Sequence, residues 1–212
     1  MTRRAAAVVA LLVAVALALG VLVGANLGRP SIFAVPADPS VDAGFARDMQ
    51  AHHGQAVELA RMVRDRTQDE EVRTLALDIL LTQQNQAGQM GGWLDTWGLP
   101  RSTTQEPMAW AGDHQHGTSS DDPDATGLAA MPGWVSTDDM ARLRDAEGTE
   151  AERLFLQLMI PHHHGGVEMA QMAIDDAQTP QVRRLAESII ESQTGEITVL
   201  EEMLEERGGP LA

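Results

Sequence analysis

A motif that combines one methionine with two adjacent histidines occurs twice in this chain, and it limits the possible folds more than any other feature. The first copy contains Met49, His52 and His53, and the second contains Met159, His162 and His163. The shift of 110 positions continues as far as the glutamines Gln83 and Gln193. A match of this length indicates a tandem duplication of one structural unit. We therefore expect two equivalent halves that bring sulfur and imidazole groups together in one metal centre.

Each repeat has the apolar spacing of amphipathic helices, and short turn signals divide it into two helices. Asp38 before Pro39, and Thr179 before Pro180, are typical of helix starts. Asp69 is expected to cap the second helix of the first hairpin. The expected segments are a first helical hairpin over 38–97, a crossover linker over 98–135, and a short helix with a second hairpin over 136–207. The predicted fold class is all-α. Two duplicated antiparallel hairpins would form a ferritin-like four-helix bundle over 38–207.

The first residues of the chain, 1–27, differ in composition from the rest. Two arginines precede an almost unbroken apolar run from Ala5 to Ala25, which is typical of an export signal. The run has about 20 residues, enough to span a bilayer. We expect a transmembrane signal anchor, with a cleaved signal peptide as the alternative, followed by a linker over 28–37. The remainder would lie on the extracytoplasmic face of the cell envelope, membrane-anchored or, after cleavage, secreted.

The composition excludes several functions. The formal net charge is -16 and aromatic residues make up 3%, which disfavours nucleic-acid binding, because phosphates require a basic surface and exposed bases require stacking partners. The chain has no cysteine, so disulfides and thiolate metal sites are excluded.

The helical phase determines which polar residues face the bundle core. At about 100° per residue, both histidines of each motif fall on the inward-facing arc, whereas His164 and the glutamate of each motif fall outside it. Gln83 and Gln193 interrupt apolar stripes in the partner helices, and Glu196 follows Gln193 at the edge of its stripe. These groups are expected to meet the histidines in one polar layer, either hydrogen-bonded to them or binding an ion with them.

The residue types favour a soft metal ion. Thioether and imidazole ligands together are typical of Cu(I), and Ag(I) resembles Cu(I) chemically. The predicted ligands are Met49, His52, His53, Met159, His162 and His163. Further candidates are Met62, Met169 and Met172 in the helices and His114 and His116 in the linker. The Glu-x-x-His signature of di-iron bundles and the H-E-x-x-H motif of zinc hydrolases are both absent.

The two motifs share the pattern M-x-x-H-H-x-x-[AG]-V-E-[LM]-A. This pattern resembles the one in domain-of-unknown-function family 305 (DUF305). The resemblance covers about residues 40–206 and includes the segment Met131-Pro132-Gly133. It implies a ferritin-like four-helix bundle and copper binding, because the family includes a periplasmic copper-binding protein. Carried over by position, it implies that the methionine and the two histidines of each motif face the metal.

We therefore predict an extracytoplasmic protein that buffers or delivers Cu(I) or Ag(I) without enzymatic turnover, with a copper exporter or chaperone as a possible partner. Two alternatives remain at the level of sequence. One is a structural or interaction bundle in which a hydrogen-bonded layer of His and Gln binds no metal. The other is a ferritin-like di-metal oxidoreductase.

Overall fold

The computed structural model describes residues 14–17, 20, 35–112 and 125–211. The chain divides into two compact units, Met1–Val35 and Pro36–Ala212. In the first unit, 14–17 and 20 are helical. Among the described residues, no helix combines the length and the apolar character that a membrane crossing requires. The signal anchor expected over 1–27 stays a prediction, because most of its residues lie outside the described part of the chain.

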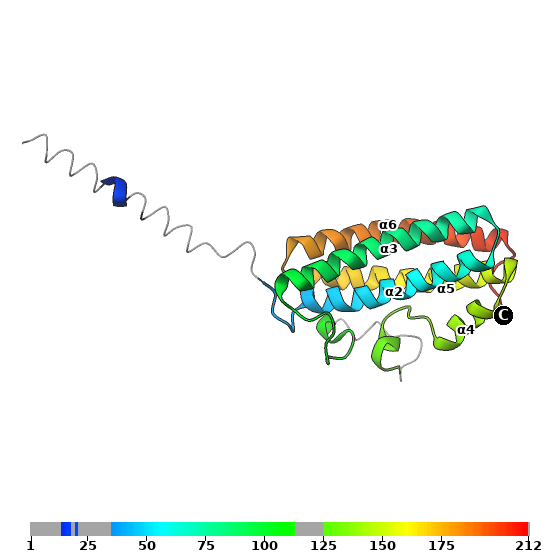
Figure 1. Cartoon of the computed structure of the whole chain (residues 1–212), viewed down its shortest axis with the longest axis horizontal. Coiled ribbons are helices and arrows are strands. Elements are labelled where there is room, and N and C mark those ends of the chain that lie inside the picture. Colours follow the sequence, from blue (N-terminus) through cyan, green and yellow to red (C-terminus); the bar gives the residue numbers. More distant parts are fainter. Residues whose placement is uncertain (1–13, 18–19, 21–34, 113–124, 212) are drawn as a thin grey trace, which may run out of the picture. The chain divides into compact units, whose positions relative to one another are not determined.

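Four long helices form the second unit. They are α2 (Val41–Arg66), α3 (Glu70–Trp97), α5 (Gly148–Asp176) and α6 (Pro180–Glu206). The short elements η2 (Gly127–Ala130) and α4 (Thr137–Asp145) lie between the two hairpins in the sequence. Figure 1 shows α2 beside α5, with each helix antiparallel to its neighbour in the chain. The described residues contain no strand, which confirms the all-α prediction, and the long helices form a four-helix bundle.

The helix starts follow from local capping. Ser40 caps α2 by accepting a hydrogen bond from the Ala43 amide at 3.2 Å, so the helix begins slightly after the expected Asp38. Serine is a strongly preferred N-cap residue, and Ser40 rather than Asp38 stands directly before the first helical residue. Asp69 caps α3 as expected, and Ser136 caps α4.

Two buried carboxylates at equivalent positions connect each hairpin to the turn of the other. Asp42 accepts hydrogen bonds from the Thr179 amide at 2.8 Å and from its hydroxyl at 2.7 Å, and from the Gln178 amide at 3.1 Å. Its counterpart, Glu152, accepts a hydrogen bond from the Thr67 hydroxyl. The duplication therefore extends to the contacts between the halves, and the bundle has a pseudo-two-fold axis.

The Asp42 contact gives a stability prediction. Asp42→Ala leaves the buried donors of Thr179 without an acceptor, so we expect the free energy of unfolding to fall by about 3 kcal/mol. Urea denaturation of the variant and the parent protein would measure this change. Asp78→Ala, at an exposed position on α3, is the matched control and should change stability by less than about 0.5 kcal/mol. Equal effects of the two substitutions would contradict the prediction.

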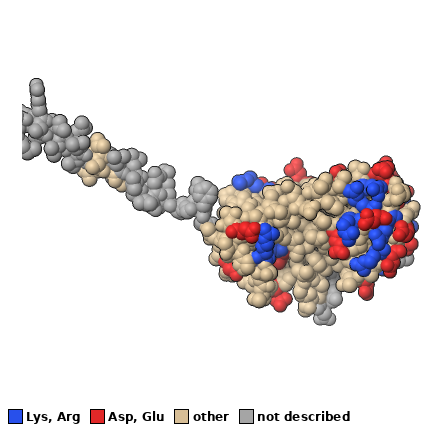
Figure 2. Space-filling view, viewed as in Figure 1, with Lys and Arg blue, Asp and Glu red and all other residues tan. Residues whose placement is uncertain are grey.

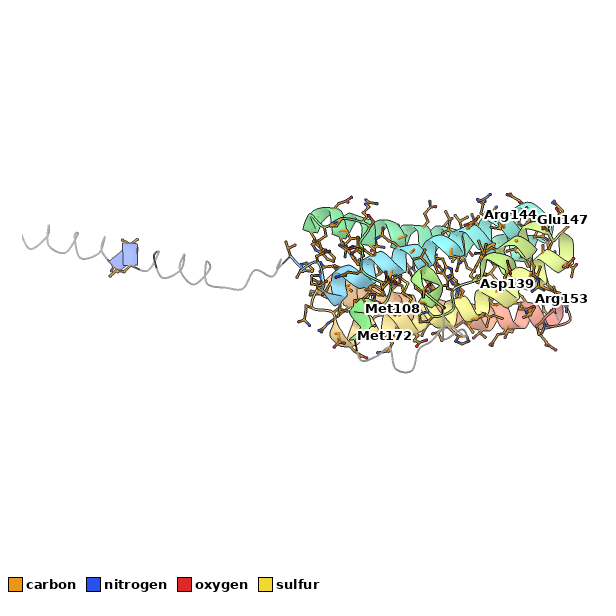
Figure 3. All side chains as sticks on the ribbon, turned by 90° about the horizontal axis from the view of Figure 1, so that it is seen from below. Met108, Asp139, Arg144, Glu147, Arg153 and Met172 are labelled. Atoms are coloured by element: carbon orange, nitrogen blue, oxygen red, sulfur yellow. The ribbon has the colours of Figure 1, made fainter. Side chains whose placement is uncertain are left out.

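The core consists of two apolar clusters. The first, which we call the α4 cluster, contains Met62, Ile79, Leu143, Phe155, Met159 and Leu204 among others. The other, here the Trp110 cluster, contains Phe45, Met49, Met90, Met108, Met169 and Met172 among others. Figure 3 labels Met108 and Met172 close together at one end of the bundle. The middle turns of the helices, which carry the two histidine pairs, separate the clusters.

The crossover between the hairpins packs on the bundle at two places. The carboxylate of Asp48 accepts hydrogen bonds from the Met108 amide and the Trp110 indole, both at 2.7 Å. Further along, the Gln55 side chain forms a pair of 2.9 Å hydrogen bonds with the backbone of Val135. The described parts of the segment expected as a linker therefore cover the face of α2.

Charged side chains gather at one end of the bundle. Figure 2 shows acidic and basic groups intermingled near the turn between α2 and α3, whereas the middle of this face carries few charges. At that end Arg207 pairs with Asp69 and with Glu152, each at 3.1 Å. These ion pairs connect the C-terminal end of α6 to both hairpins.

Candidate metal centre

The four histidines of the duplicated motifs are all fully buried at 0% exposure. His52 and His162, which are related by the duplication, meet with ring centroids 3.9 Å apart and ring planes inclined by 32°. The pseudo-two-fold axis therefore passes between these two rings. His163 lies beside His162, with centroids 6.4 Å apart. The structure thus brings the two histidine pairs together between the apolar clusters.

Three of the four rings donate their Nε2 proton to a fixed acceptor. His52 donates to the Pro132 carbonyl at 3.1 Å, and His53 donates to Oε1 of Gln86 at 2.8 Å. His163 donates to the carboxylate of Glu196 at 2.6 Å. Because these oxygens can only accept, each ring carries a proton on Nε2, and Nδ1 is the nitrogen left to face the interior of the layer. Metal-binding histidines are typically oriented in this way.

The other ring nitrogens lack partners. The Nδ1 atoms of His52, His53 and His163 are buried without a hydrogen-bond partner among the described residues. The side-chain amide nitrogen and oxygen of Gln83 and of Gln193 also lack a hydrogen-bond partner among the described residues. Each of these glutamines is only 1% exposed. We call these four histidines, with Gln83, Gln86, Gln193 and Glu196, the polar layer. Such a concentration of unpaired polar atoms in a core is costly unless it binds something.

Burial disfavours the charged form of three of the rings. Loss of solvation lowers the pKa of His52 from 6.5 to about 4, although the hydrogen bond to Pro132 opposes the shift. The same loss, together with the neighbouring His52, lowers the pKa of His53 to about 3. The pKa of His162 is also well below its ordinary value, mainly through burial. Neutral rings keep their lone pairs available as ligands.

The predicted methionine ligands lie on opposite sides of the polar layer. Met49 is one helical turn before its histidine pair, and so is Met159, which places each sulfur on the same helix face as its own pair. Both are fully buried, but Met49 belongs to the Trp110 cluster and Met159 to the α4 cluster. The antiparallel arrangement of α2 and α5 explains this separation.

The secondary candidates are more dispersed. Met62 lies in the α4 cluster, whereas Met169 and Met172 lie in the Trp110 cluster. The linker residues His114 and His116 fall outside the described residues. His164 is exposed, as expected, but Glu168 is half-buried rather than fully solvated, because it lines a cleft of about 560 Å³ beside the crossover. Burial in this cleft raises the pKa of Glu168.

Sequence reasoning missed the backbone acceptor Pro132. Pro132 packs directly against the backbone of α5: a Cβ added to Gly165 would come within 2.0 Å of the Pro132 carbonyl oxygen. Gly133 has a φ of +69°, and a Cβ added there would come within 2.2 Å of the Pro161 carbonyl oxygen. The sequence signal was the Met131-Pro132-Gly133 segment within the family resemblance, but its hydrogen bond to His52 depends on the tertiary fold.

No group of three or more His, Asp or Glu side chains within the described part of the chain is spaced to hold a metal ion. A centre in the polar layer would therefore combine imidazole nitrogens with methionine sulfur. Imidazole suits copper, and thioether sulfur selects the cuprous state. The residues present fit a soft ion of this kind better than a hard cation, which requires several oxygen ligands.

The fold and the site together define a class: an all-α four-helix bundle with a duplicated, buried histidine layer. The DUF305 family, a domain of unknown function, matches residues 42–204, and this chain belongs to it.

Solved structures of the same fold support the assignment. A DUF305 protein of Streptomyces coelicolor, described as a candidate secreted protein, is 44% identical and has a TM-score of 0.74 over 83% of this chain and 99% of its own. A DUF305 fragment of Deinococcus radiodurans is 36% identical, with a TM-score of 0.64 over 78% of this chain and 96% of its own. CopM in its Cu(I)-bound form is 23% identical, with a TM-score of 0.59 over 79% of this chain and 98% of its own.

A curated relative matches a shorter region. An uncharacterized protein of Acanthamoeba polyphaga mimivirus is 33% identical over 54 residues, which are 26% of this chain and 36% of that protein. The match therefore spans about a third of the length of this relative.

Proposed function

We propose that this protein binds Cu(I) or Ag(I) in the polar layer and buffers or delivers the ion without enzymatic turnover. The observation that carries the proposal is the common orientation of His52, His53 and His163. Each ring donates its Nε2 proton to a fixed oxygen, and its Nδ1 atom is buried without a hydrogen-bond partner among the described residues. Met49 and Met159 would add sulfur from either side.

The comparisons support the same function at a general level. CopM has been solved in Cu(I)-bound, Cu(II)-bound and Ag-bound forms, so this fold accommodates such ions in another protein. The Streptomyces relative is described as a candidate secreted protein. Together with the apolar N-terminal run, this supports a location outside the cytoplasm, where a copper exporter or chaperone would be the partner.

A purely structural layer is the second candidate, and one observation favours it. His53 and Gln86 form a well-aligned 2.8 Å hydrogen bond, as expected of a register-fixing polar contact in a bundle. However, the four unpaired amide atoms of Gln83 and Gln193 weaken this alternative, because a layer that serves only structure should satisfy its own polar groups.

A Cu(I) competition titration with a chromogenic chelator tests the proposal. The full-length chain is expected to withdraw Cu(I) from the chelator, and a variant with His52, His53, His162 and His163 all replaced by glutamine is expected to lose at least about 100-fold in affinity. The reason is that glutamine keeps a polar group but removes the imidazole lone pair.

His164→Gln is the matched control, because it removes an exposed histidine next to the motif, and it should leave the affinity unchanged. Circular dichroism of each variant would verify the helical fold. A folded four-glutamine variant with the parent affinity, or a parent protein that binds no Cu(I), would overturn the proposal in favour of the structural alternative.

A further inference from the structure

The duplication is broken at one position of the polar layer. Gln86 in α3 and Glu196 in α6 are equivalent by the shift of 110 positions, and each accepts a hydrogen bond from the outer histidine of its own hairpin. One half therefore contributes a neutral amide and the other a carboxylate. The geometry is otherwise the same, since His53 and His163 each bond to a residue 33 positions later.

This difference determines the charge of the layer. Of the hydrogen bonds that the four histidines make within the described residues, only the one to Glu196 reaches a carboxylate. An imidazole that binds a metal ion does so as a neutral ring, because the ion and a proton compete for the same lone pair. The layer thus combines imidazole and amide groups with a single carboxylate.

Charge controls which ion a buried site can accept. The cost of moving an ion out of water rises steeply with its charge, and only nearby opposite charge offsets it. One carboxylate balances a monovalent cation, whereas a divalent cation would retain one uncompensated positive charge in the core. Glu196 is suited to this role because its side chain is 21% exposed, so the empty site keeps its carboxylate partly hydrated.

We infer that Glu196 is the specificity-determining residue that makes the polar layer select monovalent over divalent cations. This inference rests on the proposed function, because it assigns the charge of the ion bound at the same site. Gln86 is the complementary element: its neutral amide keeps the count at one carboxylate. It also lines a groove of about 400 Å³ between α3 and α6, so its side chain lies near solvent.

Ag(I) and Zn(II) are suitable probes, since neither changes oxidation state in air. Both would be titrated into the full-length chain in chloride-free buffer. Glu196→Gln keeps an acceptor for His163, as Gln86 does for His53, but removes the negative charge. It should therefore weaken Ag(I) binding about 10- to 100-fold, the usual range for a change in the group behind a metal ligand. Gln86→Glu should strengthen Zn(II) binding at least about tenfold, because two carboxylates balance a divalent charge.

The double variant Glu196→Gln with Gln86→Glu separates charge from position. It moves the carboxylate to the other half of the layer and should restore Ag(I) affinity to within about threefold of the parent protein, a change of less than one kcal/mol by the usual conversion. Glu191→Gln removes an exposed charge from the same helix and should leave both affinities unchanged.

The outcomes distinguish the two proposals. If the parent protein binds neither ion, the proposed function fails. If it binds Ag(I), but the ratio of Ag(I) to Zn(II) affinity is the same in the parent, Glu196→Gln and Gln86→Glu proteins, only the inference about Glu196 fails. A double variant that stays as weak as Glu196→Gln would also overturn the inference, since the position and not the charge would then matter.

Discussion

Metal-free protein is expected to unfold as the pH falls from about 6.5 to about 4.5. The reason is that burial lowers the pKa of His52, His53 and His162 in the fold, whereas these residues have ordinary histidine pKa values in the unfolded chain. In this range the unfolded state binds more protons, so the stability is complete above about pH 6.5 and is lost as the pH falls.

The expected effect is large. At about pH 4.5, two pH units below the ordinary histidine value, each ring that stays neutral in the fold costs roughly 2.5 kcal/mol. Three such rings together approach the total stability of about 5–15 kcal/mol that a domain of this size has. Urea denaturation at a series of pH values, in the presence of a chelator, would measure the slope.

Two variants serve as comparisons for the acid effect. His53→Gln removes one of the buried titrating groups. The number of protons taken up on unfolding should fall by about one, so the stability of this variant should depend less steeply on pH. His164→Gln removes an exposed histidine and should leave the slope unchanged. A stability that stays constant between pH 7 and pH 5 would contradict the neutral, buried state of the rings.

Gly165→Ala should destabilise the protein by about 3 kcal/mol and separate the crossover from α5. The added methyl group would lie 2.0 Å from the Pro132 carbonyl oxygen and 2.8 Å from the Gly133 amide nitrogen. Both are backbone atoms and cannot rotate away. Since Pro132 also accepts the proton of His52, the variant should lose metal affinity together with stability.

Gly54→Ala is the control, and it should change the stability in the opposite direction. It lies on α2 with no atom within 4 Å of the added methyl group, so the substitution should stabilise the helix by about 0.5–1 kcal/mol. Thermal unfolding of the two variants beside the parent protein would measure both effects. A Gly165→Ala protein as stable as Gly54→Ala would show that the crossover does not pack on α5 as described.

Much of the architecture was accessible from sequence because it depends on local chemistry and on the repeat. Helical periodicity predicted that the four histidines, Gln83 and Gln193 would be buried and that His164 would be exposed, and the structure agrees at each position. The capping role of Asp69 also followed directly from its place before an apolar-periodic segment.

The remaining features depend on contacts between distant segments. The positions of Met49 and Met159 on opposite sides of the layer follow from the antiparallel packing of α2 on α5, which the motif alone does not specify. The role of Pro132 and the half-buried state of Glu168 depend on where the crossover lies. Periodicity cannot predict these, because the crossover has no regular repeat of its own.

Gln86 and Glu196 occupy equivalent positions but differ in charge, and this difference bears on how such a site could arise. A dimer of two identical hairpins would carry the same residue at both positions, because a two-fold axis repeats every side chain. Its layer would hold either no carboxylate or two, never one. An odd number of charges on a symmetry axis requires both halves to be encoded in a single chain, where each can mutate alone. Covalent fusion of the repeats would thus have opened a charge state that a symmetric assembly cannot reach.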